Sequence, residues 1–160
     1  MTPRLKHIAA AAGPDDLAAV ADLFRAYAQS LPIDLDAHGF GDELAGLPGA
    51  YVPPDGGLWL ARGAGGAALG CVALRPLPGP GLCELKRLYL RPEARGTGLG
   101  RALTETAVAA ARARGYTEMR LDTLPSLTAA VALYESLGFR AIADYNGSPY
   151  PGTLFFSLAL

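Results

Sequence analysis

A glycine-rich turn flanked by arginines is the part of this sequence whose residue types and spacing point most directly to chemistry. Residues 95–101 run Arg-Gly-Thr-Gly-Leu-Gly-Arg and follow an apolar, strand-like stretch. Glycines at the start of a helix leave backbone N–H groups open to a ligand, and the positive end of the helix dipole lies at the same place. Five of the fourteen Lys and Arg residues fall within residues 84–101. We therefore expect this segment to bind a phosphate group.

Two familiar phosphate motifs do not fit this turn. The dinucleotide fingerprint needs Gly-x-Gly-x-x-Gly, whereas Gly96, Gly98 and Gly100 are spaced two and two, with Arg101 after them. A P-loop would need Gly-Lys followed by Ser or Thr, which the turn lacks. A nucleotide-binding module of another kind and a plain structural turn stay open as alternatives.

Turn residues and hydrophobic periodicity divide the chain into alternating short elements around this turn. Apolar residues recur at helical spacing in four segments: 14–30, 39–47, 98–114 and 126–137. Short apolar runs bounded by Gly and Pro predict strands at 5–9, 58–62, 67–75, 82–90, 119–124, 139–145 and 153–158. The order β-α-α-β-β-β-α-β-α-β-β indicates an α+β or mixed α/β fold.

Length and composition favour one globular domain over residues 1–160. The net charge of −1 argues against a nucleic-acid partner. No apolar run approaches the ~20 residues of a membrane span and no signal peptide is evident, so we expect a cytoplasmic protein without a membrane partner. Cys71 and Cys83 lie in consecutive predicted strands and are expected to be free, buried thiols. Scattered cysteines and histidines predict no metal site.

Charge is distributed unevenly along the chain. Residues 1–55 carry three cations and eight acids, whereas residues 56–160 carry eleven cations and seven acids. The split suggests two ligands of opposite charge, with solvated surfaces as the alternative explanation.

Two segments together resemble the signatures of the GNAT superfamily of acyl-CoA-dependent N-acyltransferases. The first is Arg95-x-x-Gly98-x-Gly100, which is similar to the pyrophosphate signature that opens the family's third helix. The second is the run Ala130-Val-Ala-Leu-Tyr-Glu-Ser-Leu-Gly-Phe139, which is similar to the family's Ala-x-x-Leu/Phe-Tyr-x-x-x-Gly-Phe. With the order of elements, the resemblance covers nearly the whole chain. It implies one GNAT-like domain with a mostly antiparallel, twisted sheet of six to seven strands, about four helices, and strands 4 and 5 splayed apart.

The resemblance implies acetyl-CoA as co-substrate, with no metal. Backbone groups of the fourth strand, at Leu88, Tyr89 and Leu90, would pair with the pantetheine arm. The pyrophosphate would lie on the turn formed by Arg95, Gly96, Thr97, Gly98, Leu99, Gly100 and Arg101. One departure concerns Leu127, where the family often has an asparagine that contacts the cofactor arm.

The resemblance also implies candidate catalytic residues for direct transfer to an amine. Tyr134 matches the family's helix tyrosine near the CoA sulfur and could protonate the leaving thiolate. Its alternative is a core tyrosine on an apolar helix stripe. Glu84 lies near the place where several histone-acetylating members carry a general base, but a cross-strand ion pair or recognition of a cationic substrate would explain it equally.

The acceptor side of the family is built largely by the N-terminal helices and the last strands. Because those helices fall in the acidic part of this chain, we expect a cationic small amine or a peptide amine as acceptor. Tyr145 and Tyr150 lie around the last β connection, which often shapes the acceptor pocket in the family. A homodimer is common in the family and is left open here. The alternative function is a catalytically weak, acyl-CoA-binding regulatory domain.

Overall fold

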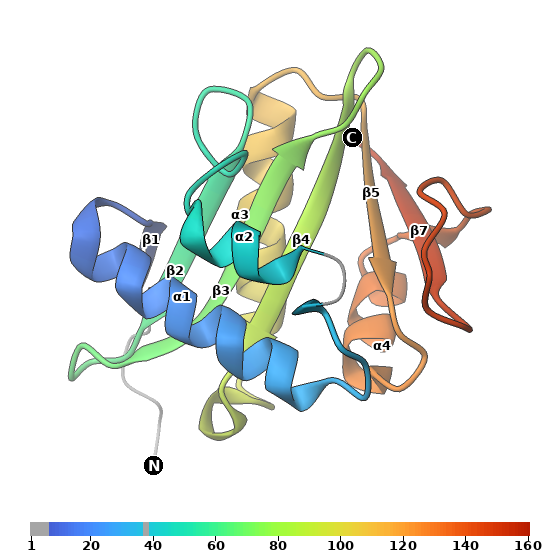
Figure 1. The fold of residues 1–160 in the computed structure, drawn as a ribbon. Helices are drawn as coiled ribbons and strands as arrows, with labels where there is room; N and C mark the ends of the chain where they lie inside the picture. Colours follow the sequence, from blue (N-terminus) through green and yellow to red (C-terminus); the bar gives the residue numbers. More distant parts are fainter. Residues whose placement is uncertain (1–6, 37–38) are drawn as a thin grey trace.

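A seven-stranded mixed sheet forms the centre of the molecule in the computed structural model, which describes residues 7–36 and 39–160 (Figure 1). Within these residues the strand order is β1-β2-β3-β4-β5-β7-β6. Neighbouring strands are antiparallel, except that β4 and β5 run parallel. The strands are β1 (His7–Ala10), β2 (Gly57–Arg62), β3 (Ala68–Pro76), β4 (Leu82–Leu90), β5 (Glu118–Thr123), β6 (Arg140–Ala141) and β7 (Leu154–Ala159).

Helices cover both faces of this sheet and create two separate cores (Figure 1). On one face lie α1 (Gly13–Ser30) and α2 (Phe40–Ala45), where Val20, Leu23 and Phe24 of α1 are fully buried. On the other face lie α3 (Leu99–Ala113) and α4 (Thr128–Ser136). The fold predicted from the sequence is confirmed in its class and order of elements, and the described residues form four α-helices, as expected. In the part of the chain described, no helix is long and apolar enough to cross a membrane.

Local sequence explains where the helices begin and end. Pro14 lies in the first turn of α1 together with two acids, and both features favour a helix start. The apolar stripe of α3 is buried against the sheet, and Gly115, with φ +85°, provides the left-handed residue after the helix. The expected helices at 14–30 and 98–114 are therefore confirmed. The first strand was expected at 5–9, and its residues 5 and 6 lie outside the described part.

The parallel pair β4 and β5 separates along its length, as predicted. Pairing is limited to three residues of each strand, Leu82–Glu84 with Glu118–Arg120. Beyond Glu84, β4 continues for six more residues without β5 as a partner, while its other edge stays paired with β3. The splay therefore opens a gap inside the sheet, on the strand that precedes the glycine-rich turn.

The strand predicted at 139–145 is much shorter in the structure. Only Arg140–Ala141 pairs with β7, and one further backbone bond runs from Ile142 to Phe155. The Asp144 carboxylate then accepts hydrogen bonds from the amides of Asn146 and Gly147, at 2.8 and 2.7 Å. These bonds form an Asx turn, which ends the extended conformation. The chain beyond it is a loop, and much of β7 is left without a partner on its outer side.

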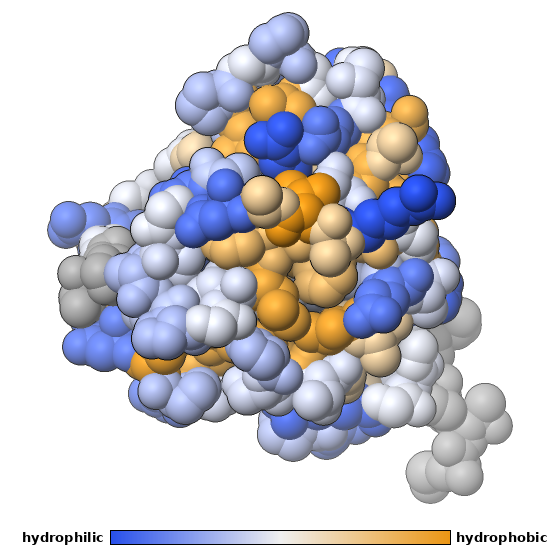
Figure 2. All heavy atoms as spheres, turned by 90° about the vertical axis from the view of Figure 1, so that its right-hand side faces the viewer, coloured by the Kyte–Doolittle hydropathy of each residue, from blue (hydrophilic) through white to orange (hydrophobic). Residues whose placement is uncertain are grey.

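Two further features of the sheet concern its surface and its cysteines. Figure 2 views the side that carries β7 and shows apolar side chains gathered at its centre, bordered by hydrophilic ones.

Cys71 and Cys83 are both free and buried. They belong to the cores on opposite faces of the sheet, so the expectation of free, buried thiols is confirmed.

Candidate acetyl-transfer site

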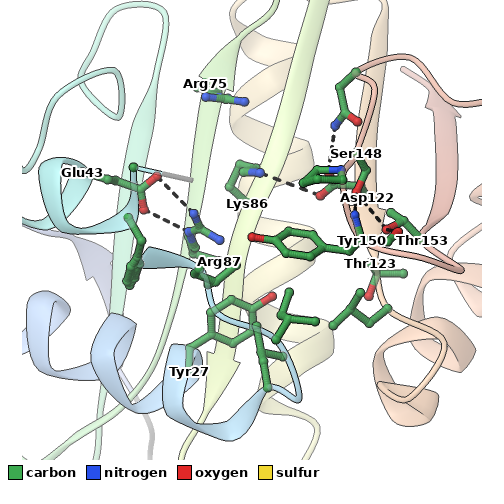
Figure 3. Close-up of a pocket in the computed structure, with 18 residues that line it drawn as sticks. Tyr27, Glu43, Arg75, Lys86, Arg87, Asp122, Thr123, Ser148, Tyr150 and Thr153 are labelled. Carbon is green, nitrogen blue, oxygen red and sulfur yellow. Dashed lines mark hydrogen bonds and ion pairs between the residues drawn. The ribbon is translucent and has the colours of Figure 1, made fainter. Parts of the chain in front are cut away.

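A pocket of about 310 Å³ lies between the α1–α2 segment, the splayed strands and the β6–β7 loop (Figure 3). Tyr27 of α1 and Tyr150 of the loop reach into it from opposite sides. Burial raises the pKa of the Tyr27 phenol, so this residue stays neutral. Apolar side chains form one part of the wall, including Leu31, Ile33 and Leu35. The wall also contains five charged side chains, those of Glu43, Arg75, Lys86, Arg87 and Asp122.

Arg87 and Glu43 form a pair that fixes α2 to the sheet at this wall. The Arg87 guanidinium donates from Nε and one Nη to the two carboxylate oxygens, at 2.9 and 3.2 Å. The Tyr51 hydroxyl donates to the same carboxylate at 3.0 Å. Burial opposes ionisation of Glu43, but the bonds from Arg87 outweigh it and hold the pKa of Glu43 below its ordinary value. Arg87 has φ +58° and lies where the β3–β4 register shifts, so a bulge turns this side chain toward α2.

Glu84 lies beneath the same wall and does not line the pocket. Its side chain is fully buried and opposite Arg75 in the β3–β4 register. Arg75 Nε donates to one carboxylate oxygen at 2.7 Å, and the Tyr145 hydroxyl donates to the other. Lys86 Nζ lies 3.9 Å from Glu84. With both oxygens bonded and no exposed surface, this geometry favours the cross-strand ion pair over the general-base alternative.

Asp122 of β5 stands at the opposite side of the pocket. Asn146 Nδ2 donates to one of its carboxylate oxygens at 2.7 Å, and Lys86 Nζ lies 3.7 Å from the other. The side chains of Lys86 and Asp122 are 14% and 25% exposed. The pair therefore spans the mouth of the gap between β4 and β5, where a substrate could reach it.

A narrow notch of about 30 Å³ occupies the gap itself. The notch is lined by Leu88 of β4, by Leu127 at the N-cap of α4, and by Tyr134 of α4. The notch shares Tyr27, Lys86, Arg87, Asp122 and Thr123 with the larger pocket, so the two cavities meet at the splay.

Tyr134 packs against Phe139 at 5.7 Å between ring centroids and is 6% exposed. Burial raises the pKa of the Tyr134 phenol, which keeps the proton on the hydroxyl. None of the hydrogen bonds among the described residues uses this hydroxyl.

The glycine-rich turn leads from the end of β4 into α3 and leaves an open cradle. Gly96 and Gly98 have φ of +73° and +84°, and a Cβ atom at either would meet nothing within 4 Å. Gly98 is the N-cap of α3, and no side chain of residues 7–36 and 39–160 caps this helix. The amides of its first turn are therefore free for an anionic ligand.

The two arginines of the turn contact the protein rather than the open cradle. Arg95 donates to the Leu90 carbonyl at 3.2 Å and lies over the Tyr89 ring at 5.8 Å. Arg101 donates to Ser136 of α4 at 2.8 Å and to Glu105 at 3.4 Å. Together they connect the turn with β4 and with α4, the helix that carries Tyr134.

Comparison with known proteins decides the family. The model of the acetyltransferase (GNAT) family matches residues 18–139. The chain belongs to the GNAT acetyltransferase family. An uncharacterized N-acetyltransferase of Schizosaccharomyces pombe is 41% identical over 160 residues, which span all of this chain and 98% of that protein.

Solved structures agree with this assignment. A Klebsiella pneumoniae structure, assigned provisionally as an acyl-CoA N-acyltransferase, is 30% identical with a TM-score of 0.75 over 98% of both chains. A GNAT-family acetyltransferase from Staphylococcus aureus has a TM-score of 0.81 over 97% of this chain and 99% of that chain. At 19% identity, the second likeness supports the fold alone.

The structure of this GNAT protein brings together most residues predicted for the site. Leu88 and Tyr134 meet in the notch, while the turn from Arg95 to Arg101 lies at the adjoining end of β4. Two of the leucines predicted for cofactor binding, Leu90 and Leu99, pack in the core on the α3 face. The Tyr89 ring is buried on the opposite face, 6.0 Å from Tyr27 between ring centroids. Only the backbone of Tyr89 is therefore suited to the predicted role.

Sequence reasoning missed several residues of the pocket, including Tyr27, Arg75, Ser148 and Thr153. Arg75 had a usable signal, since a charged residue ends the otherwise apolar run 68–74 of a strand. The others carry no pattern of their own. Tyr145, which was considered for the pocket wall, instead lies behind it, against Glu84 and Phe155.

Proposed function

We propose that this GNAT N-acetyltransferase uses acetyl-CoA as donor and transfers the acetyl group directly to an amine held in the pocket. The observation that carries the proposal is the junction of the two cavities at the β4–β5 splay. A donor approaching from the turn and an acceptor approaching from the pocket would meet at this junction. The relatives named above support N-acetyl transfer as the general activity, and the meeting of the two cavities supports an approach from each side.

The residues at the donor side fit the shape and charge of CoA. Gly96 and Gly98 leave room for a pyrophosphate above the free amides of α3, where the helix dipole favours negative charge. No strand of the described residues lies beside the edge of β4 beyond Glu84. An amide-containing pantetheine arm could satisfy these backbone groups by pairing as a strand does. Leu127 lines the notch without a polar group, so this arm would depend on the backbone there.

Direct transfer needs a proton for the leaving sulfur. The amine nitrogen attacks the thioester carbonyl carbon, a C–N bond forms, and the C–S bond breaks. Tyr134 would donate its phenolic proton to the departing thiolate, and the attacking nitrogen would lose one proton to solvent through the pocket. The raised pKa of Tyr134 keeps this proton available throughout the neutral range.

Glu84 is given a positioning role in this scheme. Its buried carboxylate holds Arg75 and the Tyr145 hydroxyl, so it connects β3, β4 and the β6–β7 loop. The pocket wall above it depends on these contacts. The acetylated group would be an amine of a small molecule or a peptide, and neither nucleic acid nor membrane is proposed as a partner.

The proposal is tested by measuring CoA release from acetyl-CoA with a panel of primary amines, with the products identified by mass spectrometry. We expect acetylated amine and CoA in equal amounts. Binding of acetyl-CoA without acetylation of any amine would support the regulatory-domain alternative instead. A larger rise in melting temperature with NAD or ATP than with acetyl-CoA would contradict the donor assignment.

A further inference from the structure

The wall of the pocket formed by β3 and β4 presents two cations from adjacent positions of the sheet. Arg75 is opposite Glu84 in register, and Lys86 lies two residues beyond Glu84, so all three side chains leave the same face. The Arg75 side chain is 38% exposed and that of Lys86 is 14% exposed, and both line the pocket. In Figure 3, Arg75 and Lys86 stand along β3 and β4 beside the open space.

These two cations have donor groups that the protein does not use. Arg75 bonds Glu84 through Nε alone, and among the described residues its terminal nitrogens make no hydrogen bond. Lys86 Nζ lies 3.9 Å from Glu84 and 3.7 Å from Asp122, beyond hydrogen-bond distance in both cases. Arg87 differs, because Glu43 already takes two of its donors. The wall therefore has unused donors that could give hydrogen bonds to an anion.

The acids of the N-terminal helices do not balance these cations inside the pocket. The sequence-based expectation of a cationic acceptor used Asp15, Asp16, Asp22, Asp34, Asp36, Asp42 and Glu43. Of these acids only Glu43 lines the pocket, and its carboxylate is bound by Arg87. Asp122 is then the one lining carboxylate, among the described residues, with a position close to the notch. A dicationic amine would have to place its second charge against Arg75 and Lys86.

We propose that Arg75 and Lys86 form an anion subsite and that the acceptor is an amine that also carries a carboxylate. This inference rests on the proposed function and specifies its substrate class. The carboxylate would accept from the terminal nitrogens of Arg75 and from Lys86 Nζ, which are charge-assisted hydrogen bonds. The amine would then point along the pocket toward Asp122 and Thr123, where the pocket meets the notch.

The remaining wall suggests the rest of the acceptor. Leu31, Ile33, Leu35 and Phe40 face the pocket from the α1–α2 segment, and Leu124 and Pro149 face it from the other side. An apolar side chain between these walls would leave water, which adds to binding. An apolar amino acid such as leucine therefore has the carboxylate, the amine and the apolar side chain that these parts of the pocket could bind.

The test compares leucine, leucinamide and putrescine as acceptors at saturating acetyl-CoA. Leucinamide keeps the amine and the side chain but lacks the carboxylate, and putrescine carries a second cation. We expect kcat/KM for leucine to exceed that for leucinamide by at least about tenfold, since hydrogen bonds to charged groups have this strength. A preference for leucinamide or putrescine would overturn the proposal. A leucyl dipeptide distinguishes a free amino acid from a peptide whose carboxylate lies further from the amine.

Variants assign the preference to the two cations. Lys86→Gln and Arg75→Gln are each expected to bring the leucine-to-leucinamide ratio close to one, and Lys86→Glu should favour leucinamide. Arg62→Gln is the matched control, because Arg62 is 33% exposed on β2 and pairs with Asp16 outside the pocket. If Arg75→Gln does not fold because the buried Glu84 carboxylate loses its partner, Lys86→Gln alone tests the subsite. An unchanged ratio in Lys86→Gln would refute the subsite.

Failure of the proposed function is separable from failure of this inference. If the enzyme acetylates no amine, calorimetry with N-acetylleucine and N-acetylleucinamide still measures the subsite. Tighter binding of the carboxylate form, lost in Lys86→Gln, would support the subsite without turnover. Equal binding of the two forms would overturn it.

Discussion

Replacing Gly98 by alanine tests the phosphate cradle more directly than removing a charge. Gly98 is the N-cap of α3 with φ +84°, and a Cβ atom there would meet no protein atom within 4 Å. The methyl group therefore costs backbone strain without a clash. Strain of this kind is about 1–2 kcal/mol for a residue other than glycine. Gly98→Ala should lower the free energy of unfolding by that amount, measured by urea denaturation.

The same methyl group would stand where the pyrophosphate is proposed to lie. Loss of one charge-assisted bond to a backbone amide costs about 1.5–3 kcal/mol, which corresponds to roughly a 10- to 150-fold weaker Kd. We expect this loss in the Kd of CoA, measured by calorimetry, and in the KM for acetyl-CoA. The KM for the amine should change little, because the pocket lies beyond the notch.

Gly115 supplies a matched control at the other end of α3. Its φ is +85°, and a Cβ atom there also meets nothing within 4 Å. Gly115→Ala should therefore lower stability about as much as Gly98→Ala and leave CoA binding unchanged. Equal effects of the two variants on the Kd of CoA would refute the cradle, since strain alone would then explain both.

Three further substitutions test the roles assigned to the site. Tyr134→Phe should lower kcat about 100-fold with little change in the KM for acetyl-CoA, since general acids contribute about that much; Tyr116→Phe, remote from the site, is the control, and an unchanged kcat in Tyr134→Phe would exclude the general-acid role. Glu84→Gln should cost about 3 kcal/mol of stability in urea denaturation, because a buried pair loses one partner; loss of the acidic limb of the kcat/KM profile would instead restore its role as a base. Glu43→Gln should destabilise the protein by about 1.5–3 kcal/mol at neutral pH through its bonds to Arg87. Because the pKa of Glu43 is lowered in the folded state, this difference should shrink as pH falls below its ordinary value of 4.5, and a difference that grew in acid would contradict the assignment.

Local signals in the sequence were sufficient for most of the fold. Gly115 and Gly138 follow two helices whose apolar residues recur at helical spacing, so the extents of these helices were predictable. The Asx turn at Asp144 was not, because residues 139–145 form a mostly apolar run like a strand and the turn depends on one carboxylate accepting bonds from two amides. The splay was expected from the family resemblance and not from the residues themselves.

The candidate site could be predicted only in part from the sequence. The signatures placed Tyr134 and the turn from Arg95 to Arg101 correctly in the fold, because signature residues lie together in sequence. The pocket combines β3, β4, β5 and two loops, so its charge depends on register and on which side chains face inward. A count of acids could not show that Glu43 is bound by Arg87. The partnership of Arg75 with Glu84 likewise required the β3–β4 register.

The short pairing of β4 with β5 also has a consequence for amide hydrogen exchange. Amides in the central strands of a sheet normally exchange slowest, because their bonds open only when much of the protein unfolds. Here β4, the fourth of the seven strands in the described part of the chain, has one edge without a partner strand beyond Glu84. Amides of β4 that face this edge should exchange quickly, while those bonded to β3 are protected. A weakly protected seam therefore lies near the middle of the sheet, and a bound ligand that pairs with β4 would slow exchange there.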